Sequence, residues 1–132
     1  MKPPTSVGEP TYDQRVFVNC PFDDAYRPLQ RALVFVLLTC GLEPQLSESK
    51  DAATARLTQI KALIRTCRYS VHDISRCEPL LPDDLPRFNM PFELGLDFGY
   101  KEYGPAAART KMVLVLEAKQ YRYQKVLSDS VV

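Results

Sequence analysis

The chain has 132 residues and a hydrophobic content of 45%, enough to fill one core without disulfides or a structural metal. Its 17 basic and 16 acidic residues leave a net charge of +1, which provides no general field for a polyanion and makes nucleic acid an unfavourable partner. Eleven prolines, five glycines and the lack of a repeated unit exclude collagen-like, low-complexity and solenoid architectures. We expect a single globular domain over residues 15–132, preceded by a flexible arm over 1–14.

The first 14 residues lack the basic and then apolar pattern of a secretory signal, so we expect a cytoplasmic protein. The longest apolar run, 32–40, has about half of the roughly 20 residues that span a bilayer, so we expect no membrane partner. The four cysteines form no Cys-x-x-Cys pair, and the single histidine cannot complete a usual zinc set with them. We therefore expect neither metal nor cofactor, and interpret the cysteines as reduced core residues.

The first half of the domain alternates strand-like and helical segments. Residues 15–19 form a β-branched and aromatic run that predicts a strand buried on both faces. Apolar residues at helical spacing over 26–40, with a proline in the first turn and Gly41 as a stop, predict a helix, although 33–38 alone is compatible with a strand. A short strand over 42–46 and a polar turn over 47–53 follow.

The clearest helical pattern runs from Thr54, a candidate cap, to Cys67, with apolar residues three or four apart. Residues 68–75 have the length of a strand and place Asp73 near its carboxyl end. Three prolines make 77–89 a loop, which serves either as a lid or as a stiff connector.

The last third of the chain repeats the alternation. We expect a helix from Pro91 to about Tyr103, a strand over 112–117 covered on both faces, and a helix over 120–128. The complete order predicts a doubly wound α/β domain, with a parallel sheet of four strands between two helical layers. Such folds usually have five strands, so the chain is either a shortened version or lacks a last strand beyond Val132.

Parallel sheets place ligands beyond the carboxyl ends of their strands. Four segments meet this rule: 19–24, 47–50, 73–76 and 89–93. The candidate carboxylates among them are Asp73 and Glu93. With Pro91 as the first helical residue, Glu93 would be the third, where the helix dipole stabilises its charge. An anionic glutamate can stabilise or attack a cationic sugar-like transition state while a second carboxyl group orients or protonates, which favours chemistry at an anomeric carbon.

Each candidate also has a purely structural interpretation. Glu93 would be an ordinary charge in a first helical turn, and Asp73 would cap a turn through Ser75 or Arg76. Asn19 either lines the floor of a ligand site or belongs to an ordinary turn. His72 points away from Asp73 on an alternating strand and is expected to be a hydrogen-bonded core group.

Aromatic and basic residues near these segments have two interpretations as well. The rings of Phe22 and Tyr26 suit a nucleobase, but Tyr26 fits the apolar stripe of its helix equally well. Arg76 and Arg87 could pair with a phosphate or simply solvate a loop. A basic face over 61–68 would contact a partner or be a solvated surface. The absence of a Gly-rich phosphate loop argues against P-loop and Rossmann dinucleotide enzymes.

Three segments together resemble a known group of proteins. They are residues 15–24, the pentapeptide His72-Asp73-Ile74-Ser75-Arg76 and the octapeptide Phe88-Asn89-Met90-Pro91-Phe92-Glu93-Leu94-Gly95. An Asp after the third strand and a Phe-Glu-Leu-Gly tetrapeptide that opens the next helix make the chain similar, over about 15–117, to bacterial TIR-like (Toll/interleukin-1 receptor-like) domains and their nucleoside 2-deoxyribosyltransferase relatives.

The resemblance implies a flavodoxin-like sheet and cleavage of an N-glycosidic bond in NAD, a nucleoside or a nucleotide. It implies that Glu93 is catalytic at the ribose and that Asp73 binds a sugar hydroxyl. The residues expected to bind substrate are Asn19, Phe22, Ser75, Arg76, Asn89 and Met90. A homo-oligomer or a partner protein is expected. The alternative is a non-catalytic nucleotide-binding or self-associating TIR-like signalling module, which a missing fifth strand favours.

Overall fold

The computed structural model describes residues 8–47, 53–79, 81–83 and 85–126. Four strands form one fully parallel sheet in the order β2-β1-β3-β4: β1 (Arg15–Asn19), β2 (Glu43–Leu46), β3 (Tyr69–Asp73) and β4 (Met112–Leu116). The helices are α1 (Arg27–Thr39), α2 (Ala53–Thr66), α3 (Asn89–Tyr103) and α4 (Arg122–Val126), with 3-10 turns η1 (Tyr12–Gln14) and η2 (Ala106–Thr110). The predicted doubly wound, flavodoxin-like α/β architecture is confirmed.

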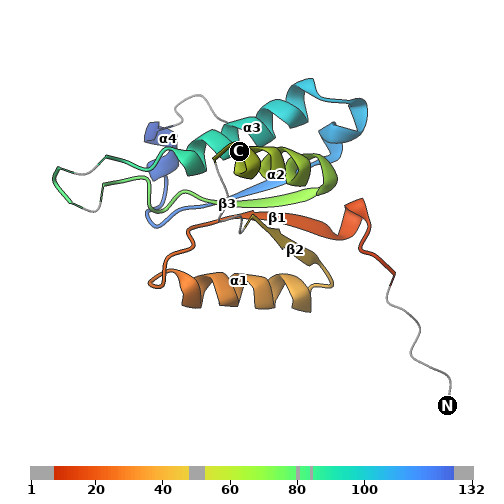
Figure 1. Ribbon diagram of the computed structural model, residues 1–132, viewed down its shortest axis with the longest axis horizontal. Helices are drawn as coiled ribbons and strands as arrows, with labels where there is room; N and C mark the ends of the chain where they lie inside the picture. The colour runs from red at the N-terminus through yellow and green to blue at the C-terminus, as the bar shows by residue number, and fades with distance from the viewer. Residues whose placement is uncertain (1–7, 48–52, 80, 84, 127–132) are drawn as a thin grey trace, which may run out of the picture.

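The sheet lies between two helical layers. Figure 1 shows α1 below the sheet and α2 and α3 above it. The order matches the first four positions of the flavodoxin-like strand order. After β1, the next strand in the chain is added on one side of it, and β3 and β4 are then added on the other side. The carboxyl ends of β1 and β3 are therefore adjacent, and their following segments leave the sheet towards opposite layers.

Side-chain alternation along β1 divides the core into two layers. Val16 and Val18 pack with Leu33 and Leu37 of α1, whereas Phe17 points to the other face and packs with α2. This strand is buried on both faces, as predicted. Residues 33–38 are helical and not a strand, because their three- and four-residue spacing buries Leu33 and Leu37 on the same stripe. Gly41, at φ 74°, takes the left-handed conformation that ends the helix.

Helix α3 begins earlier than Pro91. Its first residue is Asn89, so Pro91 is the third helical residue and Glu93 the fifth, not the third as expected from the sequence. The reason is that the first four backbone N–H groups of a helix lack an intrahelical acceptor, and a proline at the third position therefore removes no hydrogen bond. Glu93 lies beyond the first turn, where the helix dipole acts less strongly on its charge.

The prediction that β4 is covered on both faces is wrong. Met112 and Leu114 are 59% and 55% exposed, although Val113 and Val115 on the other face pack against the apolar cluster of α3. In the part of the chain that the structure describes, β4 is an edge strand with no helix over its α1-side face. An apolar run alone does not distinguish a central strand from an edge strand.

Several smaller expectations change as well. Thr54 lies inside α2, which begins at Ala53, and is therefore not its cap. The last helix covers Arg122–Val126, and residues 127–128 of the predicted segment lie outside the described residues. Of the four free cysteines, Cys20 and Cys67 are buried, but Cys40 is exposed because it follows the end of α1 at the surface.

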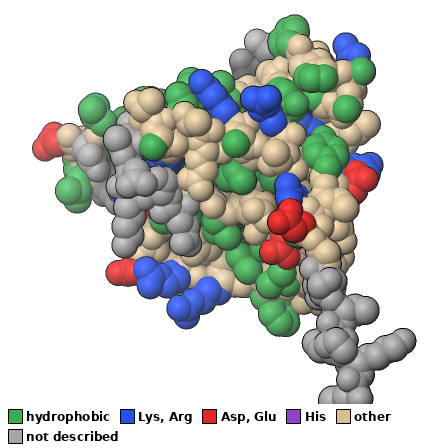
Figure 2. All heavy atoms as spheres, turned by 45° about the vertical axis from the view of Figure 1, so that its right-hand side comes forward, with side chains coloured by type: hydrophobic (Ala, Val, Ile, Leu, Met, Phe, Trp, Pro, Cys, Tyr) green, Lys and Arg blue, Asp and Glu red, His purple; other side chains and the backbone are tan. Residues whose placement is uncertain are grey.

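The polar segment before β1 is joined to the domain at its end. The backbone N–H of Arg68 donates to the carbonyl of Tyr12 at 3.2 Å, and the Arg68 guanidinium lies 2.9 Å from Asp13. No described helix is both long and apolar enough to cross a membrane. The face in Figure 2 mixes acidic, basic and apolar side chains without a large patch of one charge.

Candidate active site

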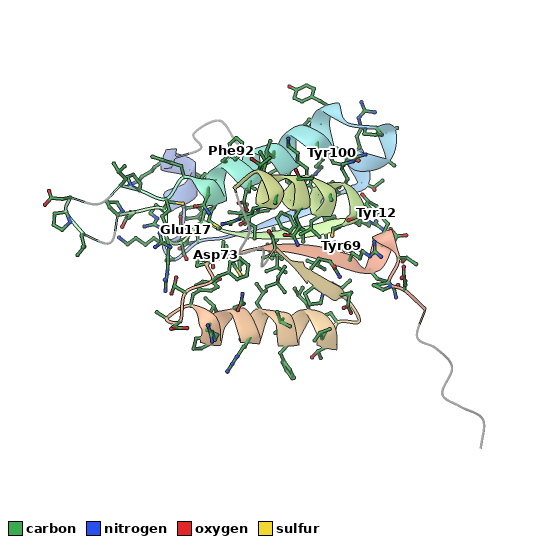
Figure 3. All side chains as sticks on the ribbon, viewed as in Figure 1. Tyr12, Tyr69, Asp73, Phe92, Tyr100 and Glu117 are labelled. Atoms are coloured by element: carbon green, nitrogen blue, oxygen red, sulfur yellow. The ribbon has the colours of Figure 1, made fainter. Side chains whose placement is uncertain are left out.

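The polar residues selected from the sequence gather at the carboxyl edge of the sheet. Figure 3 shows Asp73 and Glu117, at the ends of β3 and β4, on one side of the molecule, and Tyr69, at the start of β3, on the other. Asn19 and His72 are register neighbours at the end of the β1–β3 pair. This is the point at which doubly wound sheets bind ligands.

Asn19 has a fixed orientation. Its Nδ2 lies 2.9 Å from Nδ1 of His72 and donates to the Met90 carbonyl oxygen at 3.3 Å. Because a carbonyl oxygen can only accept, the amide nitrogen must face Met90, and His72 Nδ1 then accepts from the same nitrogen. Asn19 Oδ1 is left as the remaining acceptor of the amide. The arrangement joins the end of β1 to the first turn of α3.

His72 continues this link into the core. Its Nε2 donates to Asp97 Oδ2 at 2.9 Å, and Lys111 Nζ lies 3.3 Å from the other Asp97 oxygen. Lys111 also donates to the carbonyl oxygen of Ile64 at 2.9 Å, near the end of α2. His72, Asp97 and Lys111 are fully or almost fully buried. The expectation that His72 is a hydrogen-bonded core group is confirmed.

The charge on Asp97 is stabilised inside the protein. Burial alone would raise the pKa of this carboxyl group, but the hydrogen bond from His72 and the Lys111 ammonium outweigh burial and hold the pKa below 3.8. The network therefore contains a buried ion pair. Through His72, this pair holds the side chain of Asn19 in place at the carboxyl edge of the sheet.

Asp73 faces the α1 side of the sheet and is 2% exposed. The Tyr26 hydroxyl donates to its Oδ2, and the backbone N–H of Ser75 donates to its Oδ1 at 2.8 Å. Burial and then the hydrogen bond to Asp73 raise the pKa of Tyr26, which keeps the phenol protonated as a donor. Asp73 thus makes the turn contact considered from the sequence, and each carboxylate oxygen has the lone-pair capacity to accept a second hydrogen bond.

Glu93 lies on the opposite side of the sheet, facing α2. It is 5% exposed, and its Oε1 lies 3.3 Å from Nη2 of Arg56. Burial raises the pKa of Glu93 above its ordinary value of 4.5, and the Arg56 charge opposes that shift. Nε of Arg56 is itself buried without a hydrogen-bond partner in the described part of the chain. Among the described residues, Glu93 is therefore a desolvated carboxylate with Arg56 as its cationic neighbour.

Glu93 and Asp73 share the carboxyl edge but not a common contact. Asp73 is held by Tyr26 next to α1, and Glu93 by Arg56 of α2. No hydrogen bond or ion pair joins the two carboxylates among the described residues. A ligand that used both would have to reach across the ends of β1 and β3, where Asn19 lies.

Of the other side chains predicted to bind substrate, two are exposed and one forms an ion pair. Phe22 is 37% exposed in the loop after β1, and Asn89 is exposed at the start of α3. Arg76 forms an ion pair with Asp23 and lies 5.6 Å from the centre of the Tyr26 ring.

Two of the predicted residues contribute backbone atoms, and not side-chain atoms, to the hydrogen bonds at this edge. Met90 has a buried side chain in the α3 cluster, and its carbonyl accepts from Asn19. Ser75 contributes its backbone N–H to Asp73. Of the segment 47–50, Ser47 is buried 3.4 Å from Gln59, and 48–50 lie outside the described residues.

Sequence reasoning did not select Arg56. This residue lies in the first turn of α2, and helix N-termini converge on the same edge of the sheet as the carboxyl ends of the strands. The rule that ligands bind at this edge would have included Arg56 if it had been applied to the first turn of every helix. Asp97 and Lys111 were also missed. Nothing local to a helix-interior aspartate or to a lysine before a strand indicates that the two are paired and buried.

A structural comparison finds similarity to a solved structure described as a 2-desoxiribosyltransferase from Leishmania mexicana. The match has a TM-score of 0.57 and 15% sequence identity, and covers 90% of this chain and 74% of that one. No protein-family model and no curated protein matches the sequence. At this identity the similarity concerns the fold, and the chain therefore shares the α/β architecture of a deoxyribosyltransferase.

Proposed function

We propose that the carboxyl edge of the sheet binds a nucleoside or nucleotide and breaks its N-glycosidic bond, with Glu93 acting at the sugar. The observation that carries the proposal is the buried Glu93 carboxylate beside Arg56, at the edge where this fold binds ligands. The fold similarity to a deoxyribosyltransferase supports the same class of chemistry. TIR-like cleavage of NAD is a narrower form of this proposal, because it breaks the same type of bond.

In the proposed reaction, a Glu93 oxygen forms a bond to the anomeric carbon as the bond from that carbon to the base nitrogen breaks. The base leaves with the electron pair; the base of a neutral nucleoside then takes a proton from solvent, whereas the nicotinamide of NAD leaves as a neutral molecule and takes none. Water then displaces Glu93 and releases the free sugar, or a second base displaces it and completes a transfer. Both outcomes return Glu93 to its ionised form.

Arg56 would keep Glu93 ionised and oriented. Because burial favours the protonated acid, a guanidinium at 3.3 Å counteracts the loss of solvation. Arg56→Gln should therefore lower base release and move the acid limb of its pH profile to higher pH. Arg56→Lys keeps the charge and should retain more of the activity.

Asp73 and Asn19 would hold the sugar. Asp73 is oriented by Tyr26 and Ser75 and can accept a hydrogen bond from a sugar hydroxyl, and Asn19 offers Oδ1 from its fixed amide. Phe22 and Arg76 would contact the base and a phosphate, and Asn89 and Met90 would border the sugar. Substitution of Asp73 by Asn should raise KM more than it lowers kcat.

The test is release of free base from NAD and from a panel of nucleosides, deoxynucleosides and nucleotides. Wild type is compared with Glu93→Gln, which keeps the shape of the side chain, and with Glu102→Gln, which alters an exposed glutamate on the same helix. We expect release by wild type and by Glu102→Gln, and a loss of at least about 100-fold in Glu93→Gln. Absence of release across the panel at any protein concentration would exclude the enzymatic proposal.

A second candidate is a non-catalytic, self-associating module that binds a nucleotide without chemistry. The exposed apolar face of β4, with Met112 and Leu114, favours association through this strand. Such a module would bind nucleotide equally well with Glu93 or Gln at the site, and binding would raise the melting temperature of both proteins.

A further inference from the structure

A hollow opens at the carboxyl edge of the sheet, beside the first turn of α3. It has a volume of about 720 Å³ and lies between the loop after β3, the start of α3 and the segment from Glu117 to Lys125. Pro91 lines it, but Glu93 does not. Residues two apart on a helix point in directions about 200° apart, so the hollow is separate from the Arg56–Glu93 pair.

The walls of the hollow are mainly apolar. Ile74, Cys77 and Pro86 contribute aliphatic surface, and Phe88 and Tyr121 contribute two aromatic rings. Phe88 and Tyr121 are 67% and 59% exposed as whole residues, so most of their surface is uncovered. The volume lies within the range of small-molecule sites, and uncovered rings beside proline and isoleucine favour a flat ligand.

The charges around the hollow leave a positive excess. Three basic and two acidic side chains line it, and both carboxylates pair with Arg122, at 2.7 Å for Glu78 and 2.6 Å for Glu117. Lys119 and Lys125 also line the hollow, and neither forms an ion pair with any residue in the described part of the chain. An anionic group on a ligand would therefore find two uncommitted cations.

The backbone at Tyr121 is an additional sign of a ligand site. Its φ is 62°, a left-handed conformation that is uncommon for a bulky residue and costs on the order of 1 kcal/mol or more. Such conformations cluster at sites that grip ligands. Here it holds an uncovered aromatic ring beside the hollow, one residue before Arg122.

We propose that this hollow binds a flat aromatic or heteroaromatic ring that carries one anionic group. The ring lies against Phe88 and Tyr121, and the anion lies near Lys119 and Lys125. The site is independent of the glycosidic chemistry proposed for Glu93.

The probe for this site is 8-anilinonaphthalene-1-sulfonate, an anionic aromatic dye that fluoresces in apolar surroundings, and the chain has no tryptophan to interfere. Phe88→Ala removes one wall, and Phe35→Ala is the matched control, because Phe35 is 70% exposed on α1 and lies outside the hollow. We expect one binding site per chain, about tenfold weaker binding in Phe88→Ala, and unchanged binding in Phe35→Ala. Equal binding by the two variants would overturn the proposal.

The lysines are tested with a neutral analogue of the dye, N-phenyl-1-naphthylamine. The double variant Lys119→Ala, Lys125→Ala should bind the sulfonate several-fold more weakly and the neutral dye as before. Equal weakening of both dyes would contradict the role of the two cations.

A second readout does not depend on fluorescence. Cys77 lines the hollow, whereas Cys40 is exposed elsewhere, so saturating dye should slow alkylation of Cys77 and leave that of Cys40 unchanged. Displacement of the dye by AMP would identify a nucleotide as the source of the ring and anion, and displacement by indole-3-carboxylate an aromatic acid. Unprotected Cys77, or displacement by neither compound, would refute the site.

Discussion

Glu93 Oε1 lies 3.3 Å from Arg56 Nη2, and the two residues come from different helices that meet above the end of the sheet. The glutamate is almost completely buried and the arginine is one-third exposed. Burial and the ion pair act on the Glu93 charge in opposite directions, and burial is the stronger of the two. This competition makes the charge of Glu93 sensitive to its surroundings.

The pH dependence of stability should report that competition. A carboxyl group whose pKa is raised by folding contributes most stability below its unfolded pKa and loses that contribution as pH rises through the folded pKa. Glu93→Gln removes this dependence, so its unfolding free energy relative to wild type should be higher at pH about 7 than at pH about 4. Urea unfolding at both pH values measures the difference. The exposed Glu102→Gln should show no such trend, and a trend of the opposite sign in Glu93→Gln would contradict the burial argument.

The Tyr26 hydroxyl should stabilise the fold through Asp73. Tyr26→Phe leaves a buried carboxylate with one donor fewer, at a cost of about 1.5–3 kcal/mol. Tyr103→Phe is the control, because Tyr103 is 92% exposed. Urea denaturation checks both variants, and an unchanged midpoint for Tyr26→Phe would mean that Asp73 finds another donor.

The buried Asp97–Lys111 pair should behave as a unit. Asp97→Asn leaves the Lys111 ammonium buried without its carboxylate and should cost about 3–5 kcal/mol. Because the double variant Asp97→Asn, Lys111→Met removes both charges, it should lose less than the sum of the two single losses. A double-mutant cycle by chemical denaturation measures the coupling, and additive losses would disprove it.

The same pair predicts how the stability of the fold decreases at acid pH. Since the pKa of Asp97 is lowered by folding, its stabilising contribution is present above about 3.8 and is lost as pH falls through the folded pKa. Asp97→Asn should therefore flatten the fall in stability at acid pH relative to wild type. Thermal melts across that range test this outcome, and parallel curves would refute it.

The open face of β4 should drive self-association. Leu114 is 55% exposed on an apolar strand whose outer edge has no partner in the described residues, an arrangement that favours pairing with another strand. We expect wild type to associate with rising concentration and Leu114→Lys to remain monomeric in sedimentation experiments. Phe92→Lys alters an exposed apolar residue on α3 and should associate like wild type. Equal behaviour of both variants would exclude β4 as the contact.

Local patterns were sufficient to predict the order of the elements and the edge at which polar residues collect. A continuous β-branched and aromatic run marks β1, and apolar residues repeat every three or four positions in helices such as α2. Both patterns are properties of short segments. Asp73 at the end of β3 could be placed for the same reason. Even there, the start of α3 was misplaced, because a proline is compatible with several positions in a first turn.

Only tertiary structure decided which side chains meet. Arg56 is 37 residues from Glu93, and Lys111 is 14 residues from Asp97, so no local period relates either pair. The exposed face of β4 likewise follows from its position in the sheet and not from its composition, which resembles that of a central strand. Contacts across layers depend on how helices pack on the sheet, and that packing minimises the free energy of the whole chain and not of any segment.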